Sequence, residues 1–263
     1  MPDSDTYNEK MARFSKLLTV YGRKPALETL QDERLQCQAL HLADNNREGG
    51  IVAQLSAEAA RRGIPVRHHS RAELARISKN GKQDQGVAVD VLCPSFDNID
   101  NYLATDQHSR NTRLLALDGI SNPANLGMII RSAAAGCVDG ILCPRRGTAA
   151  LGPLVIKASA GTLYRAPLLR CDSLPTALQQ CQARGFEVCT LAADASHSLF
   201  DYRPSGPVVY VLGNETVGVS TAIEALADTR LAVPMRNSVE SLNVAVTASL
   251  IAFAPAFAGT QLT

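Results

Sequence analysis

The feature that most constrains the fold is a regular alternation of short apolar runs with amphipathic helical patterns from residue 113 onward. Strands are expected over residues 114–117, 141–143, 166–169, 187–191, 208–212 and 231–233. Helical patterns fall near residues 126–135, 152–159, 174–184, 220–227 and 241–253. Strands separated by helices predict an α/β fold in which a parallel sheet is covered by helices on both faces.

The first third of the chain shows a smaller version of the same pattern. Its expected elements are a helix from Pro25 through Leu30, a strand over 38–42, a helix over 51–62 that ends at Gly63, a strand over 64–66, a short helix over 72–77 and a strand over 86–92. We therefore expect an extension over residues 1–18, a small α/β domain over 19–93, a polar linker over 94–113 and a larger domain over 114–263.

The charge of the chain is balanced overall but uneven along its length. Lys and Arg total 26 against 25 Asp and Glu, so the formal net charge is +1, which excludes a globally basic nucleic-acid coat. Residues 61–82 nevertheless hold seven basic side chains and one acidic one, Glu73. A solvated face is the ordinary explanation of such a run. In a neutral chain the local excess favours a surface that follows phosphates, and the expected contacts are Arg61, Arg62, Arg67 and Arg71.

Cysteine usage and hydropathy indicate the compartment. The seven cysteines form no C-x-x-C pair and no cluster with metal-ligand spacing, and the beginning of the chain does not resemble a signal peptide. Reduced thiols in a cytoplasmic protein without metal are therefore expected. The most apolar stretch, residues 244–258, is shorter than the roughly 20 residues of a membrane span and is interrupted by polar residues and Pro255, so it predicts a buried helix.

Several enzyme classes lose support because their motifs are missing. The chain has no G-x-G-x-x-G after a strand, no G-x-x-x-x-G-K-[ST], no H-E-x-x-H and no G-x-S-x-G. These absences argue against a classical dinucleotide fold, a P-loop nucleotidase, a zinc protease and a serine hydrolase.

Three polar segments stand out, and each directly follows an expected strand. They span residues 117–127 (LDGISNPANLG), 211–218 (VLGNETVG) and 233–244 (VPMRNSVESLNV). Ligands of open α/β sheets bind outside the carboxyl ends of the strands, where such loops gather. Glycine in these loops permits a positive φ and a close approach of the backbone to a ligand.

Each polar residue of these segments also has an ordinary structural explanation. Asn125 suits a cap of the helix that follows, and Ser241 suits a cap of the last helix. Arg131 is compatible with a solvated helix position, and Glu215 with a turn carboxylate. Taken singly, these explanations are the better ones. Taken together, three glycine- or proline-bearing strand-end loops with this set of side chains indicate a site.

The three segments resemble, in order, the three motifs of the SpoU (TrmH-like) RNA 2′-O-ribose methyltransferases of the SPOUT superfamily, and the resemblance extends over residues 113–258. The segment 157–161 (KASAG) is also similar to a family segment. Near the N-terminus, residues 21–23 (YGR), 27–30 (LETL) and 85–88 (QGVA) are similar to the start and end of the family's small ribosomal-protein-like RNA-binding domain.

The resemblance implies a parallel-sheet methyltransferase domain with a deep trefoil knot, S-adenosylmethionine as cofactor, rRNA or tRNA as substrate, and a homodimer with its active site near the subunit interface. It implies cofactor contacts, largely through backbone groups, at Leu212, Gly213, Val233, Met235 and Leu242. It implies a polar active-site set of Asn125, Arg131, Glu215, Ser241 and Asn243.

The roles of two of these residues stay open at the level of sequence. Methyl transfer to a ribose 2′-hydroxyl requires that the hydroxyl be oriented and its proton removed. The family resemblance makes Arg131 a base, but a guanidinium hardly deprotonates, so a clamp on phosphate and on the developing alkoxide charge is the preferred role. Glu215 is then either the base or the carboxylate that orients Arg131.

Two other functions remain as alternatives. The chain could be an RNA-binding module of the same family that has lost methyl transfer, and failure to bind S-adenosylmethionine would favour that. It could also be an unrelated α/β enzyme acting on a small molecule, with turnover insensitive to RNA. The complete polar set argues against the first alternative, and the basic run at 61–82 argues against the second.

Overall fold

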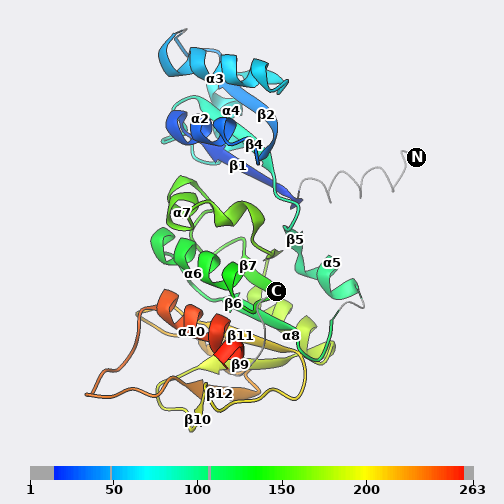
Figure 1. Cartoon of the computed structure of the whole chain (residues 1–263), viewed down its shortest axis with the longest axis vertical. Coiled ribbons are helices and arrows are strands. Elements are labelled where there is room, and N and C mark those ends of the chain that lie inside the picture. Colours follow the sequence, from blue (N-terminus) through cyan, green and yellow to red (C-terminus); the bar gives the residue numbers. More distant parts are fainter. Residues whose placement is uncertain (1–14, 48, 106–107, 258–263) are drawn as a thin grey trace. The chain divides into compact units, whose positions relative to one another are not determined.

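The computed structural model describes residues 15–47, 49–105 and 108–257 (Figure 1). The chain divides into two compact units. The first contains the residues up to Pro94 together with Leu151–Leu154, and the second contains Ser95–Ala150 and the chain from Val155 onward. Most of the expected extension, residues 1–14, lies outside the described residues, and Leu17 and Leu18 already belong to the first strand.

The first unit is a four-stranded sheet with three helices. The sheet order is β1-β4-β2-β3, with both neighbours of β4 antiparallel to it and β3 parallel to β2. Its strands are β1 (Leu17–Tyr21), β2 (Gln36–Ala43), β3 (Val66–His69) and β4 (Val87–Leu92). Its helices are α2 (Arg23–Gln31), α3 (Gly50–Arg61) and α4 (Arg71–Ser78).

The third strand of this unit begins later than the sequence pattern indicates. A strand was expected over 64–66, but β3 shares only Val66 with that range. The amide of Ile64 still donates to the carbonyl of Ala59 at 2.8 Å, which completes the C-terminal turn of α3. Pro65 has no N–H to donate to a sheet, so regular pairing with β2 begins only at Val66. Of the three apolar residues 64–66, only Ile64 is buried, in the turn that ends α3, whereas Pro65 and Val66 are exposed.

The second unit is built on an eight-stranded sheet in which every pairing is parallel. This confirms the predicted α/β class and parallel sheet. The strand order is β10-β12-β9-β11-β6-β7-β8-β5. The strands are β5 (Asp97–Asn98), β6 (Arg113–Leu117), β7 (Gly140–Pro144), β8 (Leu168–Cys171), β9 (Glu187–Leu191), β10 (His197–Ser198), β11 (Val208–Leu212) and β12 (Thr229–Ala232).

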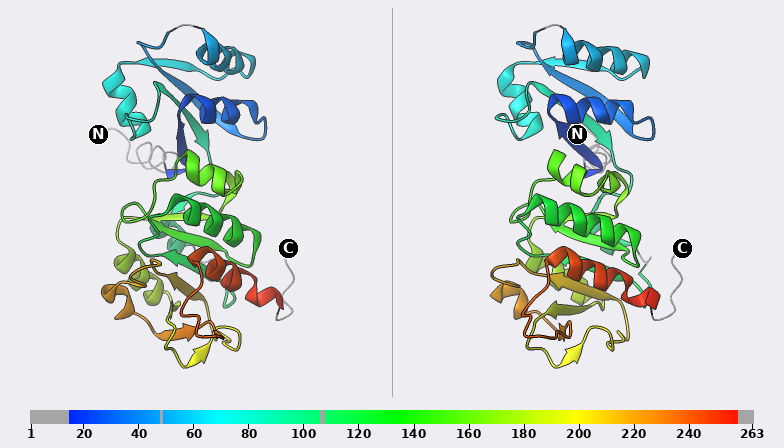
Figure 2. Two further views of the ribbon diagram at one scale, coloured as in Figure 1. Left: turned by 90° about the vertical axis from the view of Figure 1, so that its left-hand side faces the viewer. Right: turned by 60° about the vertical axis from the view of Figure 1, so that its left-hand side comes forward.

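Helices cover both faces of this sheet, as Figure 2 shows. The helices are α5 (Ile99–Ala104), α6 (Pro123–Ala135), α7 (Pro153–Ala158), the 3-10 helix η1 (Thr162–Arg165), α8 (Leu174–Ala183), α9 (Thr221–Glu224) and α10 (Val244–Phe257). Apolar side chains of α5, α8 and α9 form one continuous core with those of the strands. Helices α6 and α10 pack against each other on the opposite face. No helix of residues 15–47, 49–105 and 108–257 is long and apolar enough to cross a membrane.

The segment expected to be a linker contributes to the second unit. Residues 97–104 form β5 and α5, and β5 pairs with β8. Ile99 and Leu103, one helical turn apart on α5, are 2% and 4% exposed and belong to the core of the sheet. Two large apolar side chains are enough to anchor this helix of six residues, although the composition of 94–113 is polar overall.

The sheet brings together the ends of the strands that precede the three polar segments. Strand β11 lies between β6 and β9, and β12 pairs with β9. The register pairs Leu212 with Leu117, so β6 and β11 end at the same level. The chain therefore leaves β6, β11 and β12 at one edge of the sheet.

Candidate active site

A cavity of about 200 Å³ lies at this edge and is formed by the loops after β9, β11 and β12 and by the start of α10. Five residues that the sequence assigned to the cofactor all line it: Leu212, Gly213, Val233, Met235 and Leu242. Two residues of the expected polar set, Glu215 and Ser241, line it as well. Sequence reasoning missed its Ala192–Ala193 wall after β9, because two small apolar residues carry no motif signal.

Gly213 is required by the packing of the loop that follows β11. A Cβ at this position would lie 2.2 Å from the carbonyl carbon of Gly218 and 2.3 Å from the amide nitrogen of Val219. Both are backbone atoms, which cannot move aside as a flexible side chain would. The loop 213–218 is therefore folded so tightly on itself that only glycine fits at its start.

Hydrogen bonds join the loops after β6 and β11. The Asn214 side chain donates from Nδ2 to the carbonyl of Gly119 at 2.9 Å. The Asp118 carboxylate accepts from the amide of Ser220 at 2.7 Å. Asp118 and Asn214 thus hold two of the three polar segments together, a structural role that the sequence analysis did not assign. Their positions directly after two adjacent parallel strands were the available signal.

Asn243, Asn125 and Glu215 form a continuous chain of side-chain hydrogen bonds. Asn243 donates from Nδ2 to Oδ1 of Asn125 at 3.2 Å, and Asn125 donates from Nδ2 to a carboxylate oxygen of Glu215. The Asn243 side chain also accepts from the amide of Ala245 at 2.9 Å, which fixes it at the start of α10. Three residues from three different segments are therefore connected through Asn125, which is 7% exposed.

Asn125 and Ser241 do not cap the helices whose caps their sequence positions suggest. Asn122 caps α6, because its side chain accepts from the amides of Ala124 and Asn125 at 2.8 and 3.4 Å. The Asn125 side chain is consequently available for Glu215. Ser241 lies three residues before the first residue of α10, where it is exposed at the cavity.

Arg131 lies on a different face of α6 from Asn125. It shares an exposed stripe with Ala124, Met128 and Ala135, whereas Asn125 faces the core. Within the described residues Arg131 forms no hydrogen bond or ion pair with Glu215 or with any other side chain. The structure thus gathers Asn125, Glu215 and Asn243, with Ser241 on the cavity wall, and leaves Arg131 on an exposed helix surface.

The four arginines assigned to RNA are not equivalent. Arg61 forms ion pairs with Glu58 and Glu33 at 2.6 and 2.9 Å. Arg62 donates to the backbone carbonyls of Leu30 and Leu35 at 2.6 and 2.5 Å, so it holds the chain between α2 and β2.

The other two arginines are exposed on the same unit. Arg67 is exposed on β3. Arg71 forms an ion pair with Asp84 at 3.0 Å and borders a second cavity. The run 61–82 is therefore not one continuous free surface, since Arg61 and Arg62 are engaged by the protein itself.

Metal and thiol chemistry find no support in the described residues. No group of three or more His, Cys, Asp or Glu side chains in residues 15–47, 49–105 and 108–257 is arranged to hold a metal ion. The seven cysteines are free thiols. Burial raises the pKa of Cys181 and of Cys189 to about 12, so these thiols stay protonated at neutral pH and are poor nucleophiles.

Models of two protein families match the chain. The model described as the SpoU rRNA Methylase family matches residues 112–253. The model described as RNA 2′-O ribose methyltransferase substrate binding matches residues 19–92. A protein of Mycobacterium ulcerans named as an uncharacterized tRNA/rRNA methyltransferase is 34% identical over 233 residues, which are 89% of this chain and 74% of that protein. A protein of the same description from Mycobacterium avium is 35% identical over 233 residues, 89% of this chain and 75% of that protein.

Solved structures share the fold. The SpoU methyltransferase AviRb from Streptomyces viridochromogenes, in complex with AdoMet, aligns with a TM-score of 0.62 at 19% identity over 98% of this chain and 96% of that chain. The AdoMet-bound rRNA methyltransferase from Sinorhizobium meliloti aligns with a TM-score of 0.63 at 19% identity over 98% and 92% of the two chains.

Proposed function

Because the chain belongs to the SpoU rRNA methylase family and is an S-adenosylmethionine-dependent RNA methyltransferase, we propose that the cavity beside β11 and β12 is where a methyl group passes to a ribose 2′-hydroxyl. The observation that carries this proposal is the hydrogen-bonded chain Asn243–Asn125–Glu215, which ends at a carboxylate on the cavity wall. The proposed substrate is rRNA or tRNA.

The cavity residues fit S-adenosylmethionine. Leu212, Val233 and Leu242 supply apolar walls suited to an adenine ring, and the tight loop after Gly213 presents backbone groups to it. The carboxylates of Glu215 and Glu240 line the same cavity and favour a positively charged sulfonium. When bound, the cofactor supplies the methyl group. Leu212, Gly213, Val233, Met235 and Leu242 are the proposed residues that hold it.

Glu215 is the proposed acceptor of the 2′-hydroxyl proton. It is exposed at the cavity, and its carboxylate is positioned by the amide of Asn125, which is in turn fixed by Asn243. A general base must lie within hydrogen-bond reach of the proton that it removes, and the buried amide of Asn125 holds the Glu215 carboxylate at the cavity where the ribose is proposed to bind. Ser241 on the same wall is the proposed hydrogen-bond partner of the ribose.

Arg131 is proposed to bind a phosphate next to the methylated ribose and to stabilise the developing alkoxide. A guanidinium suits this task because it stays charged and binds phosphate through two parallel N–H groups. Arg131 lies on the exposed stripe of α6, apart from the residues of the cavity. Its proposed role therefore needs a second surface that covers this stripe. A second copy of the chain is the proposed cover, which would make the enzyme a homodimer.

Exposed apolar side chains on α6 and α10 support the homodimer. Met128 is 41% exposed beside Arg131, and Val246 on α10 is 48% exposed. The two helices run in the same direction, since Asn125 contacts Asn243 and Ser132 contacts Ser249. Met128 and Val246 therefore lie at the same level of this helix pair. The proposal also keeps two expectations from the sequence, a trefoil knot in the second unit and a cytoplasmic location.

The test is methyl transfer from radiolabelled S-adenosylmethionine to total bacterial rRNA and tRNA, followed by mapping of 2′-O-methyl nucleotides. We expect label in RNA at a 2′-oxygen, and none with Glu215→Gln even at a cofactor concentration that saturates the variant. Label on a base, or undiminished transfer by Glu215→Gln, would overturn the assignment. Failure to bind S-adenosylmethionine, with no transfer to any RNA, would favour the non-methylating RNA-binding module.

A further inference from the structure

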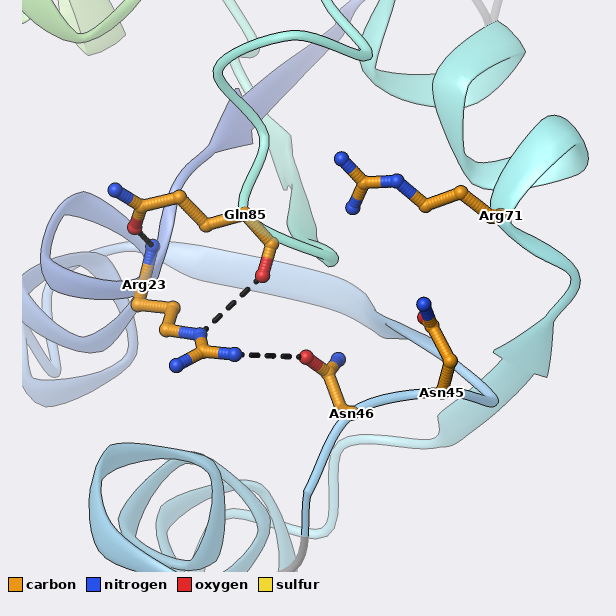
Figure 3. A pocket seen from close by; sticks show the side chains of 5 residues that line it. All are labelled: Arg23, Asn45, Asn46, Arg71 and Gln85. Carbon is orange, nitrogen blue, oxygen red and sulfur yellow. Dashed lines mark hydrogen bonds between the residues drawn. The ribbon is translucent and has the colours of Figure 1, made fainter.

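A second cavity, of about 480 Å³, lies in the first unit, far along the chain from the proposed methyl-transfer residues. It is lined by Arg23, Asn45, Asn46, Arg71 and Gln85 (Figure 3). Arg23 and Arg71 are the first residues of α2 and α4, the two asparagines follow β2, and Gln85 precedes β4. Figure 3 shows side chains from these four segments around one space.

Hydrogen bonds hold the residues on the Arg23 side of the cavity in place. The Arg23 guanidinium donates from Nε to the carbonyl of Gln85 at 3.3 Å and from Nη2 to Oδ1 of Asn46 at 3.1 Å. The backbone amide of Arg23 donates to Oε1 of Gln85 at 3.0 Å. Asn46 is itself held, because its Nδ2 donates to the carbonyl of Gly86 at 2.6 Å. The guanidinium plane of Arg23 is thus oriented from two sides.

The backbone beside this wall is strained in a way that the surrounding contacts maintain. Gln85 has a φ of 52°, a left-handed conformation that a side chain with a Cβ rarely adopts, and Gly86 follows with a φ of 75°. Such a conformation carries a steric cost in a non-glycine residue. The hydrogen bonds between Gln85 and Arg23 compensate this cost and keep the Gln85 carbonyl beside the Arg23 guanidinium.

The cavity carries an excess of positive charge. Arg71 is paired with Asp84, whose carboxylate is fully buried and also accepts from Ser78 Oγ at 2.7 Å and from the amide of Gly86 at 3.0 Å. The Asp84 carboxylate therefore neutralises the charge of the Arg71 guanidinium. Arg23 has no carboxylate partner among the described residues, and none of the five residues that line the cavity is acidic.

We propose that this cavity binds a backbone phosphate of an unpaired nucleotide in the RNA substrate. Guanidinium groups bind phosphate through charge-assisted hydrogen bonds, and the amide of Asn45 adds a neutral donor. A concave site of this size admits one splayed-out nucleotide, whereas paired RNA is contacted across its wide, shallow groove. The identity of the ligand as RNA depends on the proposed function, and the site itself depends on the cavity residues.

Asn45 offers the cleanest test, because its side chain is exposed at the cavity and makes no hydrogen bond within the described residues. Asn45→Asp introduces a negative charge with almost no change in size, and Asn45→Lys introduces a positive one. Matched controls are Gln31→Glu and Gln31→Lys, exposed at the opposite end of α2 from Arg23. Affinity for protein-free total bacterial rRNA is measured for all variants at several KCl concentrations, beside their melting temperatures.

We expect Asn45→Asp to weaken rRNA binding roughly three- to tenfold near 100 mM salt. The negative slope of log affinity against log salt should become shallower by roughly 0.7–0.9. Asn45→Lys should strengthen binding and make this slope steeper. The Gln31 variants change neither. Equal affinities and slopes in Asn45→Asp, Asn45→Lys and the controls overturn the phosphate site.

The same protein preparations separate this proposal from the proposed function. Methyl transfer from S-adenosylmethionine to the same rRNA is measured for the unchanged chain. If the chain transfers methyl groups while the Asn45 variants bind rRNA like the controls, the phosphate site fails and the enzyme assignment stands. If the Asn45 variants change rRNA binding and salt dependence while no RNA is methylated, the site stands and the proposed function fails.

Discussion

Asn125 illustrates how a single side chain acquires a role through its neighbours. Its position at the start of α6 suggested a cap, but Asn122 provides that cap. The Asn125 amide instead accepts from Asn243 and donates to Glu215. A nearly buried amide cannot leave its donor and acceptor unpaired without cost, so the three side chains stabilise one arrangement.

Arg131→Ala tests the proposed phosphate clamp. We expect cofactor affinity within about twofold of the unchanged chain and a kcat lower by about 10²–10³, because one electrostatic contact in the transition state has that effect. Calorimetry with S-adenosylmethionine and initial rates on RNA measure the two quantities. Near-normal kcat would exclude Arg131 from the reaction.

Gly213→Ala tests the tight loop after β11. Its Cβ would lie within 2.5 Å of three backbone atoms of Gly218 and Val219, so the loop must open. We expect cofactor affinity to fall at least tenfold, from loss of preorganised backbone contacts. Gly206→Ala is the control, because its nearest atom lies 3.9 Å away and its φ is not positive. Equal cofactor affinity in the two variants would contradict the assignment of this loop.

At the scale of elements, the packing of α6 against α10 determines which residues of α6 are buried and which are exposed. Their contact is close because the residues between them are small: a Cβ on Gly136 would lie 2.8 Å from the Cβ of Ala252. The Ser249 hydroxyl also donates to Ser132 Oγ at 2.7 Å. The opposite stripe of α6 keeps Met128 and Arg131 exposed.

Met128→Glu tests whether this stripe is a subunit interface. We expect the variant to sediment as a monomer where the unchanged chain sediments as a dimer, because a buried, unpaired carboxylate opposes association. Methyl transfer should fall with dimerisation, while far-UV circular dichroism should show an unchanged secondary structure, since Met128 is exposed in one chain. Leu154→Glu, at another exposed apolar position, serves as the control. Sedimentation as a monomer without any substitution would refute the homodimer.

At the scale of the whole molecule, the two units have separate supports for their folds. In the first unit, Arg62 holds the segment between α2 and β2 through backbone carbonyls. In the second unit, the core between the sheet and α5, α8 and α9 is independent of these contacts.

Arg62→Ala should therefore destabilise only the first unit. Removal of the Arg62 guanidinium leaves these carbonyls without their charged donor. We expect this loss to lower the free energy of unfolding by about 1–3 kcal/mol. Hydrogen exchange should quicken in peptides from residues 17–92 and stay unchanged in peptides from 113–257. Arg61→Ala, at an exposed ion pair, is the control with little expected effect. Faster exchange throughout the chain would show that the two units share their stability.

The sequence by itself determined the fold class, most of the strands and helices, and the composition of the proposed site. Strand 208–212 and the parallel sheet were predictable because apolar runs of five residues alternate with helices, and local periodicity reports local structure. The proposed cofactor residues came from the resemblance of the three strand-end segments to the motifs of the family.

Only the tertiary structure decided which residues meet. Nothing local distinguishes Arg62, which is engaged by backbone carbonyls, from Arg71, which borders a cavity. The carbonyls that Arg62 contacts lie 27 or more residues away along the chain, and the partners of Arg71 lie 10 or more residues away. The same holds for Arg23, Asn45 and Gln85, which periodicity cannot bring together. Long-range contacts depend on how elements pack, and packing is a property of the whole chain rather than of any segment.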